Sequence, residues 1–192
     1  MSSGAYPVSL EVDPPQPQNR LSVLLRIIFA IPTLLGAMVV GIVAYVITII
    51  AWFVVVITGK YPAGMANLPI GAVRWIARTY GYMYFLTDKY PPFSLDDDSA
   101  YPIRVNIVPQ LDGRSRLTVF FRVIMIIPHA IILGILNYVA QLLAFFAWLV
   151  ALFTGSVPAG IHNFIVGWLR WTTRYTAYAL LLTDEYPPFS LS

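Results

Sequence analysis

The sequence predicts a mainly α-helical membrane protein made of two tandem, parallel repeats. Of its 192 residues, 58% are hydrophobic and only 11% are charged, whereas a soluble domain carries roughly 25% charged residues. Two long apolar runs, 21–57 and 117–153, contain no acidic residue. The segment LTDKYPPFSL at 86–95 returns as LTDEYPPFSL at 182–191. The composition requires lipid, and the recurring ending indicates a duplication.

Matching residues recur through both halves at a spacing of 96 positions, as Pro32 and Pro128 do. The matches run from the first arginines to the final LTD–YPPF segments. We therefore expect a first unit over 1–95, an acidic linker over 96–99, and a second unit over 100–192. In each unit the sequence predicts a short strand, a helical hairpin within the membrane, an interfacial amphipathic helix and an extended YPPFSL tail.

The order of these matched residues resembles a known family. The pattern R…R…P, then W…TG..P.G..N…RW…R, then LTD.YPPFSL is similar to bacterial membrane proteins catalogued as domain of unknown function 4389. Both halves carry the pattern, so the resemblance implies two tandem copies and a bacterial origin. It implies no activity.

Charge is segregated along the chain. Residues 14–87 and 113–183 contain basic but no acidic side chains, and every carboxylate lies in the connecting stretches. Basic residues that flank apolar segments favour anionic lipid by about 1 kcal/mol each, and the long apolar runs argue against a nucleic-acid partner. The start of the chain lacks the features of a secretory signal. We expect the bacterial inner membrane, with the termini and strand regions on the cytoplasmic side.

Each unit begins with a segment that alternates between apolar and polar residues. YPVSLEVD starts at Tyr6 and YPIRVNIV starts at Tyr101, and this alternation is typical of a half-buried strand. A single strand is unstable alone. The two strands could pair with each other, with the YPPFSL tails, or with another protomer.

The long apolar runs are expected to fold as helical hairpins. One straight helix of this length would reach about 55 Å, against a hydrocarbon core of about 30 Å. Gly41 and Asn137, which tolerate the left-handed conformation, are the predicted turns, and Pro32 and Pro128 are predicted kinks. The predicted helices span 20–40 and 42–58, then 116–136 and 138–154. Thr-Gly at 58–59 and 154–155 is explained as a helix end.

The predicted turns are apolar, which favours hairpins that enter and leave the membrane on one side. A pair of short spans that reaches the far surface is the alternative. Following each hairpin, a further helix is predicted at 66–86 and 162–182, with two arginines on one stripe. Its aromatic residues are predicted to anchor it at the lipid headgroups: Trp75, Tyr80, Tyr84, Trp171, Tyr175 and Tyr178.

The duplicated arginines could hold anionic headgroups through their guanidinium groups, or could only anchor helices at the interface. These candidates are Arg20, Arg26, Arg74, Arg78, Arg116, Arg122, Arg170 and Arg174. Asp88 and Asp184 are expected either to pair with Arg26 or Arg78 and their copies, or to terminate a helix.

The sequence favours a non-enzymatic role as a structural, membrane-organising or accessory subunit. The expected partners are lipid, copies of the same chain, or a larger membrane assembly. His129 and His162 have no counterpart in the first repeat and no companion ligands, so no metal, cofactor or catalytic group is predicted. A small transporter or channel component is one alternative, although the apolar runs lack acidic groups. A lipid-headgroup-binding or lipid-modifying protein is another.

Overall fold

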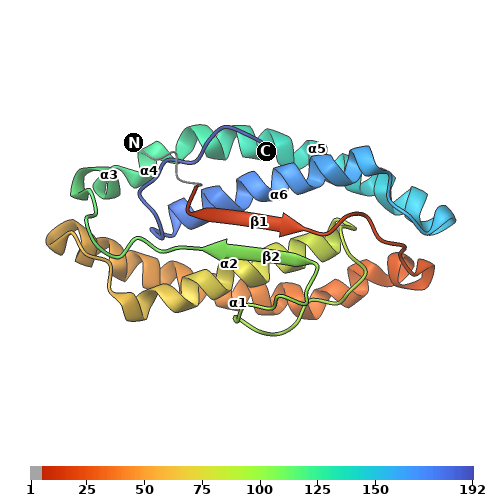
Figure 1. Cartoon of the computed structure of the whole chain (residues 1–192), viewed down its shortest axis with the longest axis horizontal. Coiled ribbons are helices and arrows are strands. Elements are labelled where there is room, and N and C mark those ends of the chain that lie inside the picture. Colours follow the sequence, from red (N-terminus) through yellow and green to blue (C-terminus); the bar gives the residue numbers. More distant parts are fainter. Residues whose placement is uncertain (1–5) are drawn as a thin grey trace.

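The computed structural model describes residues 6–192 and is mainly helical, with two similar halves, as predicted. The elements in chain order are β1 (Val8–Val12), α1 (Arg20–Thr58), α2 (Ala63–Met83), β2 (Ile103–Ile107), α3 (Arg116–Phe120), α4 (Arg122–Met125), α5 (Ile127–Thr154) and α6 (Ala159–Ala179). The long helices and the strands all lie along the longest axis of the molecule (Figure 1).

The predicted helical hairpins are wrong. α1 is one continuous helix of 39 residues, about 58 Å long, and α5 continues through Asn137. Gly41 lies inside α1 and does not have a positive φ. Gly59 and Gly155 instead take the left-handed conformation (φ 72° and 75°) and end the two long helices, which confirms the helix-end interpretation of the Thr-Gly pairs.

The two predicted proline kinks have different outcomes. Pro32 lies within the uninterrupted α1. Pro128 lies in the first turn of α5, just after the boundary with α4, where a missing N–H is tolerated. In the second repeat, the short helices α3 and α4 and the long helix α5 therefore take the place of the single helix α1.

The two predicted strands pair with each other, which was the first of the three possibilities. They form an antiparallel sheet in which Leu10 faces Val105 at the centre. These two residues are equivalent in the two repeats, so a pseudo-two-fold axis passes between them. Their side chains and those of Val8 and Ile103 are buried, whereas Ser9 and Asn106 are exposed. The apolar face of the sheet covers the helices.

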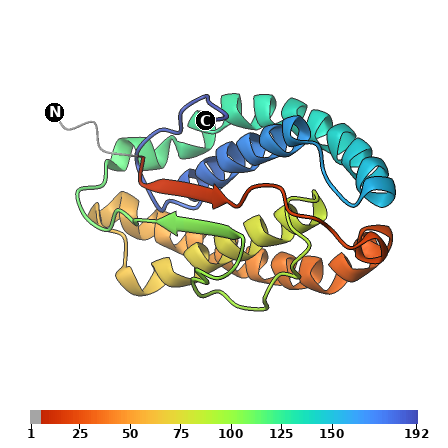
Figure 2. The same ribbon diagram turned by 45° about the vertical axis from the view of Figure 1, so that its right-hand side comes forward.

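Each strand packs on a helix of the other repeat. β1 contacts α6 and β2 contacts α2, while α1 and α5 lie outside α2 and α6. Figure 2 shows the two strands on one side of the helices from a second direction. The core lies between the sheet and the α2–α6 pair. The two repeats are therefore interlocked through their strands.

The YPPFSL tails are irregular and do not form strands. They lie against α2 and α6, where glycine makes room for them. A Cβ atom added at Gly71 would lie 2.5 Å from the Cβ of Leu95, and one at Gly167 would lie 2.8 Å from the Cβ of Leu191. Such distances are too short for carbon atoms, so a glycine is needed at each of these equivalent positions.

Candidate membrane interface

The two long helices direct most of their apolar side chains outward. One narrow stripe of α1 is buried: Val23, Arg26, Ala30, Thr33, Ala37, Ala44, Thr48, Ala51 and Val55. The stripe consists mainly of small residues, which let helices approach closely. Only 22% of the most apolar window of α1, and 17% of that of α4–α5, is buried. By length and composition these two helices could cross a membrane.

The opposite side of the molecule is polar. The outer face of the sheet carries Ser9, Glu11 and Asn106, and the nearby linker carries Asp97. Arg104 on β2 forms ion pairs with Asp13 and Glu11 across the sheet, at 2.9 and 3.5 Å. The two strands that carry Glu11 and Arg104 lie over the middle of the helices (Figure 1). The charged groups thus lie on the side of the molecule that carries the sheet, and most of the exposed apolar surface lies on α1 and α5.

Asp88 of the first LTD segment binds the beginning of α1. Its carboxylate pairs with Arg26 at 2.5 Å and accepts a hydrogen bond from the backbone N–H of Asn19 at 3.1 Å. The Arg26 guanidinium is almost completely buried and also donates to the carbonyls of Tyr82 and Thr87. Of the two predicted partners, Asp88 contacts Arg26. The tail of the repeat is thereby joined to the start of its long helix.

Asp184 makes the corresponding contacts in the second repeat and one more. It pairs with Arg122, accepts from the backbone N–H of Ser115 at 2.9 Å, and also lies 2.8 Å from the Arg114 guanidinium. Arg114 occupies the place that Gln18 has in the first repeat. The second site therefore contains two buried guanidinium groups for one carboxylate, and burial lowers the pKa of Arg114.

Gln18 and Arg114 also hold two backbone turns of unusual conformation. Phe85 and Leu181, just after α2 and α6, have positive φ values of 62° and 61°. The Gln18 amide donates to the Phe85 carbonyl at 2.6 Å, and Arg114 donates to the Leu181 carbonyl at 2.8 Å. These bonds offset part of the strain, which costs on the order of 1 kcal/mol for a non-glycine residue.

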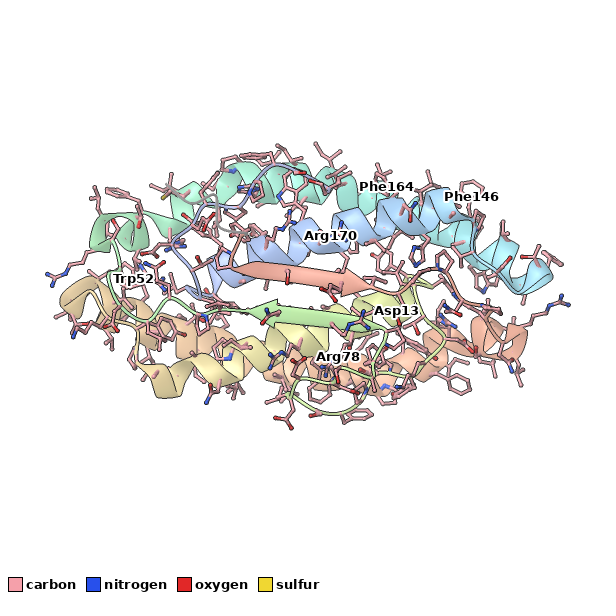
Figure 3. The ribbon with its side chains drawn as sticks, viewed as in Figure 1. Asp13, Trp52, Arg78, Phe146, Phe164 and Arg170 are labelled. Carbon is pink, nitrogen blue, oxygen red and sulfur yellow. The ribbon has the colours of Figure 1, made fainter. Side chains whose placement is uncertain are left out.

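The arginines of α2 and α6 contact backbone carbonyls. Arg74 donates to Val105 on β2, and Arg170 donates to Leu10 on β1. Arg78 donates to the Asp96 carbonyl in the linker at 2.8 Å. Figure 3 shows Arg170 and Arg78 on opposite sides of the sheet. Both arginine stripes lie against the strands and tails, and they cap the outer edges of the sheet.

Arg174 and Arg78 also lie near the tyrosines that begin the strands. The Arg174 guanidinium lies 5.9 Å from the centre of the Tyr6 ring, and Arg78 lies 5.8 Å from that of Tyr101. The Tyr6 hydroxyl donates to the Glu185 carbonyl of the second tail, and burial raises its pKa. The start of each strand is therefore held by a tail and an arginine together.

The aromatic residues predicted as interface anchors mostly pack inside the protein. Trp75, Tyr84, Trp171 and Tyr178 are buried, while Tyr80 and Tyr175 are half-buried. The indole N–H of Trp75 donates to the Thr33 hydroxyl, and that of Trp171 donates to Nδ1 of His129, both at 3.0 Å.

His129 thus accepts the bond that a threonine accepts at the equivalent position, and it stacks on Phe189 with 4.0 Å between ring centres. His162 is also buried.

The remaining predicted residues lie at or within the long helices. Arg20 and Arg116 begin α1 and α3 and are exposed. Arg20 lies next to Gly155, and Arg116 lies next to Gly59. The side chain of Asn137 accepts a hydrogen bond from the Tyr84 hydroxyl at 3.4 Å. Of the predicted arginines, the two exposed ones therefore lie next to the C-terminal ends of the two long helices.

Sequence reasoning missed Gln18, Arg114 and the two residues with positive φ. Arg114 carried a usable signal, because it breaks the repeat by placing an extra cation beside a matched aspartate. The close-packing role of Gly71 and Gly167 could also have been found, since glycines on the same stripe as arginines leave room for protein backbone rather than for lipid headgroups.

These features define a mainly helical, two-repeat protein with a small two-stranded sheet and two long helices that face outward with apolar side chains. The family model named Domain of unknown function (DUF4389) matches residues 20–94 and 116–190. The chain belongs to this family and contains two tandem copies of its domain. No curated protein and no solved structure matches the chain.

Proposed function

We propose that this chain is a non-enzymatic protein of the bacterial inner membrane that inserts into one leaflet and organises lipid, as a structural or accessory subunit. The observation that carries the proposal is the division of the molecule into an apolar side, formed by α1 and α5, and a charged side, formed by the sheet and linker. Such a division suits a molecule at the boundary between lipid and water.

The position of the charged side supports helices that lie along the membrane. If the long axis stood across the bilayer, Glu11, Asp13 and Arg104 would lie near its middle, because the sheet covers the centre of the helices. A charged side chain there costs at least about 2.5–3.5 kcal/mol. With the long axis in the membrane plane, the same residues face water. In this orientation the length of α1, about 58 Å, does not have to match the thickness of the hydrocarbon core of the bilayer, about 30 Å.

This orientation gives the protein a physical means to act on lipid. The helix α1, about 58 Å long and about 10 Å wide, occupies roughly 580 Å² of one leaflet, and the 28-residue α5 adds roughly 420 Å². Area added to one leaflet alone favours curvature. The exposed Arg20, Lys60 and Arg116 lie at the ends of the long helices, where each can attract anionic headgroups by about 1 kcal/mol.

The orientation can be tested by labelling, because the chain contains no cysteine. Lys60 and Ser156 are exposed and equivalent in the two repeats, and they follow the C-terminal ends of α1 and α5. Lys60→Cys and Ser156→Cys are each exposed to a membrane-impermeant maleimide in inside-out and right-side-out vesicles. Ser9→Cys reports the sheet, and Tyr138→Cys reports the apolar side.

We expect the Lys60→Cys, Ser156→Cys and Ser9→Cys variants to react only in inside-out vesicles, since all three positions face the cytoplasm in this orientation. The Tyr138→Cys variant should resist the water-soluble reagent and react with a lipid-soluble one. Labelling of the two helix ends from opposite sides of the membrane would overturn the proposal, because it requires helices that cross. Anionic liposomes that keep their shape at high protein loading would count against curvature.

A further inference from the structure

His129 is enclosed by aromatic rings from α6 and from the second YPPFSL tail, residues 186–191. Its ring stacks on Phe189 with 4.0 Å between ring centres and an interplanar angle of 11°, and it lies 4.8 Å from the ring of Tyr186. On the α6 side, the centres of the Trp171 and Tyr175 rings lie 5.8 and 6.4 Å away. The imidazole is fully buried. The docked tail thus forms one wall of the space that holds this histidine.

The hydrogen bonds of the imidazole require its neutral form. The indole N–H of Trp171 donates to Nδ1 of His129 at 3.0 Å, and a ring nitrogen accepts a hydrogen bond only when it carries no proton. The one proton of the neutral ring is therefore on Nε2, which has no hydrogen-bond partner. A second proton would be placed on Nδ1, where it would face the indole N–H. Protonation therefore breaks the bond to Trp171 and leaves a charged ring with two unpaired donors.

The groups around the ring do not compensate for this charge. Among the residues that the structure describes, the titratable groups that face it are the uncharged phenols of Tyr175 on α6 and Tyr186 in the tail. Burial lowers the pKa of His129, and no carboxylate opposes that effect. The stacked Phe189 ring offers a modest cation–π attraction, whereas a buried charge without a counter-ion is far more costly. The protonated ring is therefore stable only where water reaches it.

The path from His129 to water leads past the tail, because the rings of Phe189 and Tyr186 are 50% and 37% exposed. We propose that protonation of His129 releases the second tail from α5 and α6. The imidazolium turns outward and displaces the Phe189 ring that covers it. The Tyr6 hydroxyl, at the start of β1, donates to the carbonyl of Glu185 directly before this tail. Release of the tail therefore also loosens the start of β1.

The first repeat has the same tail, residues 90–95, but no titratable group at the equivalent position. Thr33 accepts the hydrogen bond from Trp75 at 3.0 Å, and its hydroxyl also bonds to that of Thr79. Threonine does not change its charge near neutral pH, whereas histidine does. Phe93, the counterpart of Phe189, packs on Trp75 with 5.5 Å between ring centres. The first tail should therefore stay docked when the second is released, and the molecule contains its own control.

The test follows each tail with a spin label, because the chain contains no cysteine. Ser94 and Ser190 are equivalent, half-buried residues of the two tails, and Ser94→Cys and Ser190→Cys each place one label. The full chain is studied in a mild detergent from about pH 7.5 to about pH 5, which covers the titration of histidine and lies above that of ordinary carboxylates. His129→Thr gives the second repeat the residue of the first, and His129→Gln keeps an uncharged acceptor. His162→Ala removes the other histidine of the chain.

We expect the label in the Ser190→Cys variant to be immobile above about pH 6.5 and to become mobile below it, because the docked tail requires neutral His129. The ratio of mobile to immobile label should rise about tenfold, the effect of one group whose pKa docking lowers by about one. The label in the Ser94→Cys variant should not change. His129→Thr and His129→Gln should remove the response, whereas His162→Ala should leave it.

An immobile label in the Ser190→Cys variant at every pH would overturn the proposal, and so would an equal response of the two tails. A response that persists in both His129 variants, or that disappears in His162→Ala, would overturn the assignment to His129. The comparison of the two tails with His129 in place decides by itself, so the test does not depend on how well the His129 variants fold. The proposed membrane orientation is tested separately, by labelling positions outside the tails.

Discussion

The unequal charge of the two arginine–aspartate sites predicts unequal sensitivity to the same substitution. Asp184 faces Arg122 and Arg114, whereas Asp88 faces Arg26 alone. Asp184→Asn would leave two buried guanidinium groups without a counter-ion, and Asp88→Asn would leave one. The side chain of Asp184 is 12% exposed and that of Asp88 is 29% exposed, so water can replace less of the lost interaction at Asp184.

The magnitude follows from known costs of breaking buried ion pairs. Removing one partner of a buried pair costs about 3–5 kcal/mol, which we expect for Asp184→Asn. A hydrogen bond to a charged group is worth about 1.5–3 kcal/mol, and we expect about 1–3 kcal/mol for the more accessible Asp88→Asn. At about 2–4 °C per kcal/mol for a chain of this size, the melting temperature should fall by about 6–20 °C and about 2–12 °C, respectively.

The assay is thermal unfolding of the purified chain in a mild detergent, followed by circular dichroism. Arg114→Gln gives the second site the composition of the first, so it should change the free energy of unfolding by less than about 1 kcal/mol. The double variant Asp184→Asn/Arg114→Gln should recover roughly half of the loss, because the surplus cation is gone. Equal losses for Asp88→Asn and Asp184→Asn, or a further loss when Arg114→Gln is added to Asp184→Asn, would contradict the role assigned to the second guanidinium group.

Three further predictions concern packing, the sheet and pH. Gly71→Ala should destabilise the fold by about 1–3 kcal/mol, because its Cβ would collide with Leu95. Gly64→Ala, whose Cβ meets nothing within 4 Å, should be neutral. Equal melting temperatures of the two variants would contradict the packing role of Gly71. Arg170→Met should speed amide exchange in β1 by uncapping its edge, whereas the exposed Arg20→Met should not; unchanged exchange in both would argue against capping. Burial lowers the pKa of His162 below 6.5. As the pH falls, the unfolded chain therefore takes up a proton on this side chain before the folded chain does. The contribution of His162 to the free energy of unfolding should be complete above about pH 6.5 and should decline below it. His162→Ala should reduce this decline between about pH 7.5 and about pH 5.5, and an identical decline in the variant would contradict the assignment.

The duplication, the strands and the long apolar segments could be predicted from sequence because each depends on a local or periodic pattern. The matched residues at a spacing of 96 define two copies, and the alternation after Tyr6 and Tyr101 defines two strands. From the sequence, the expected partner of Asp88 could be narrowed to one of two arginines, Arg26 or Arg78. The final choice depended on where the chain returns after α2, and no local pattern carries that information.

The hairpin prediction failed because a residue that tolerates a turn does not require one. Gly41 and Asn137 lie in uninterrupted apolar runs, and α2 and α6 pack beside these runs and support continuous helices. The bilayer thickness limits the length of a helix only if the helix crosses the membrane, and in the proposed orientation that limit does not apply.

The role of the α2 and α6 stripes was also beyond single-sequence reasoning. Arginine beside tryptophan and tyrosine is typical of a headgroup boundary, but here the partners of Arg74 and Arg170 are strand carbonyls from distant parts of the chain. Strand exchange between the repeats brings those carbonyls into reach. Only the glycines on the same stripes indicated that backbone lies close by.

Each strand covers a helix of the other repeat, and this exchange of strands determines how such a molecule can be assembled. A chain with a single repeat would carry a strand that has no helix of its own to cover and a helix that has no strand. Two such chains could satisfy each other about a true two-fold axis, as a swapped homodimer with the same interior. Tandem fusion then frees the two halves to diverge. Arg114 where the first repeat has Gln18, and Gln141 where it has Tyr45, are differences that an obligate pair of identical subunits could not possess.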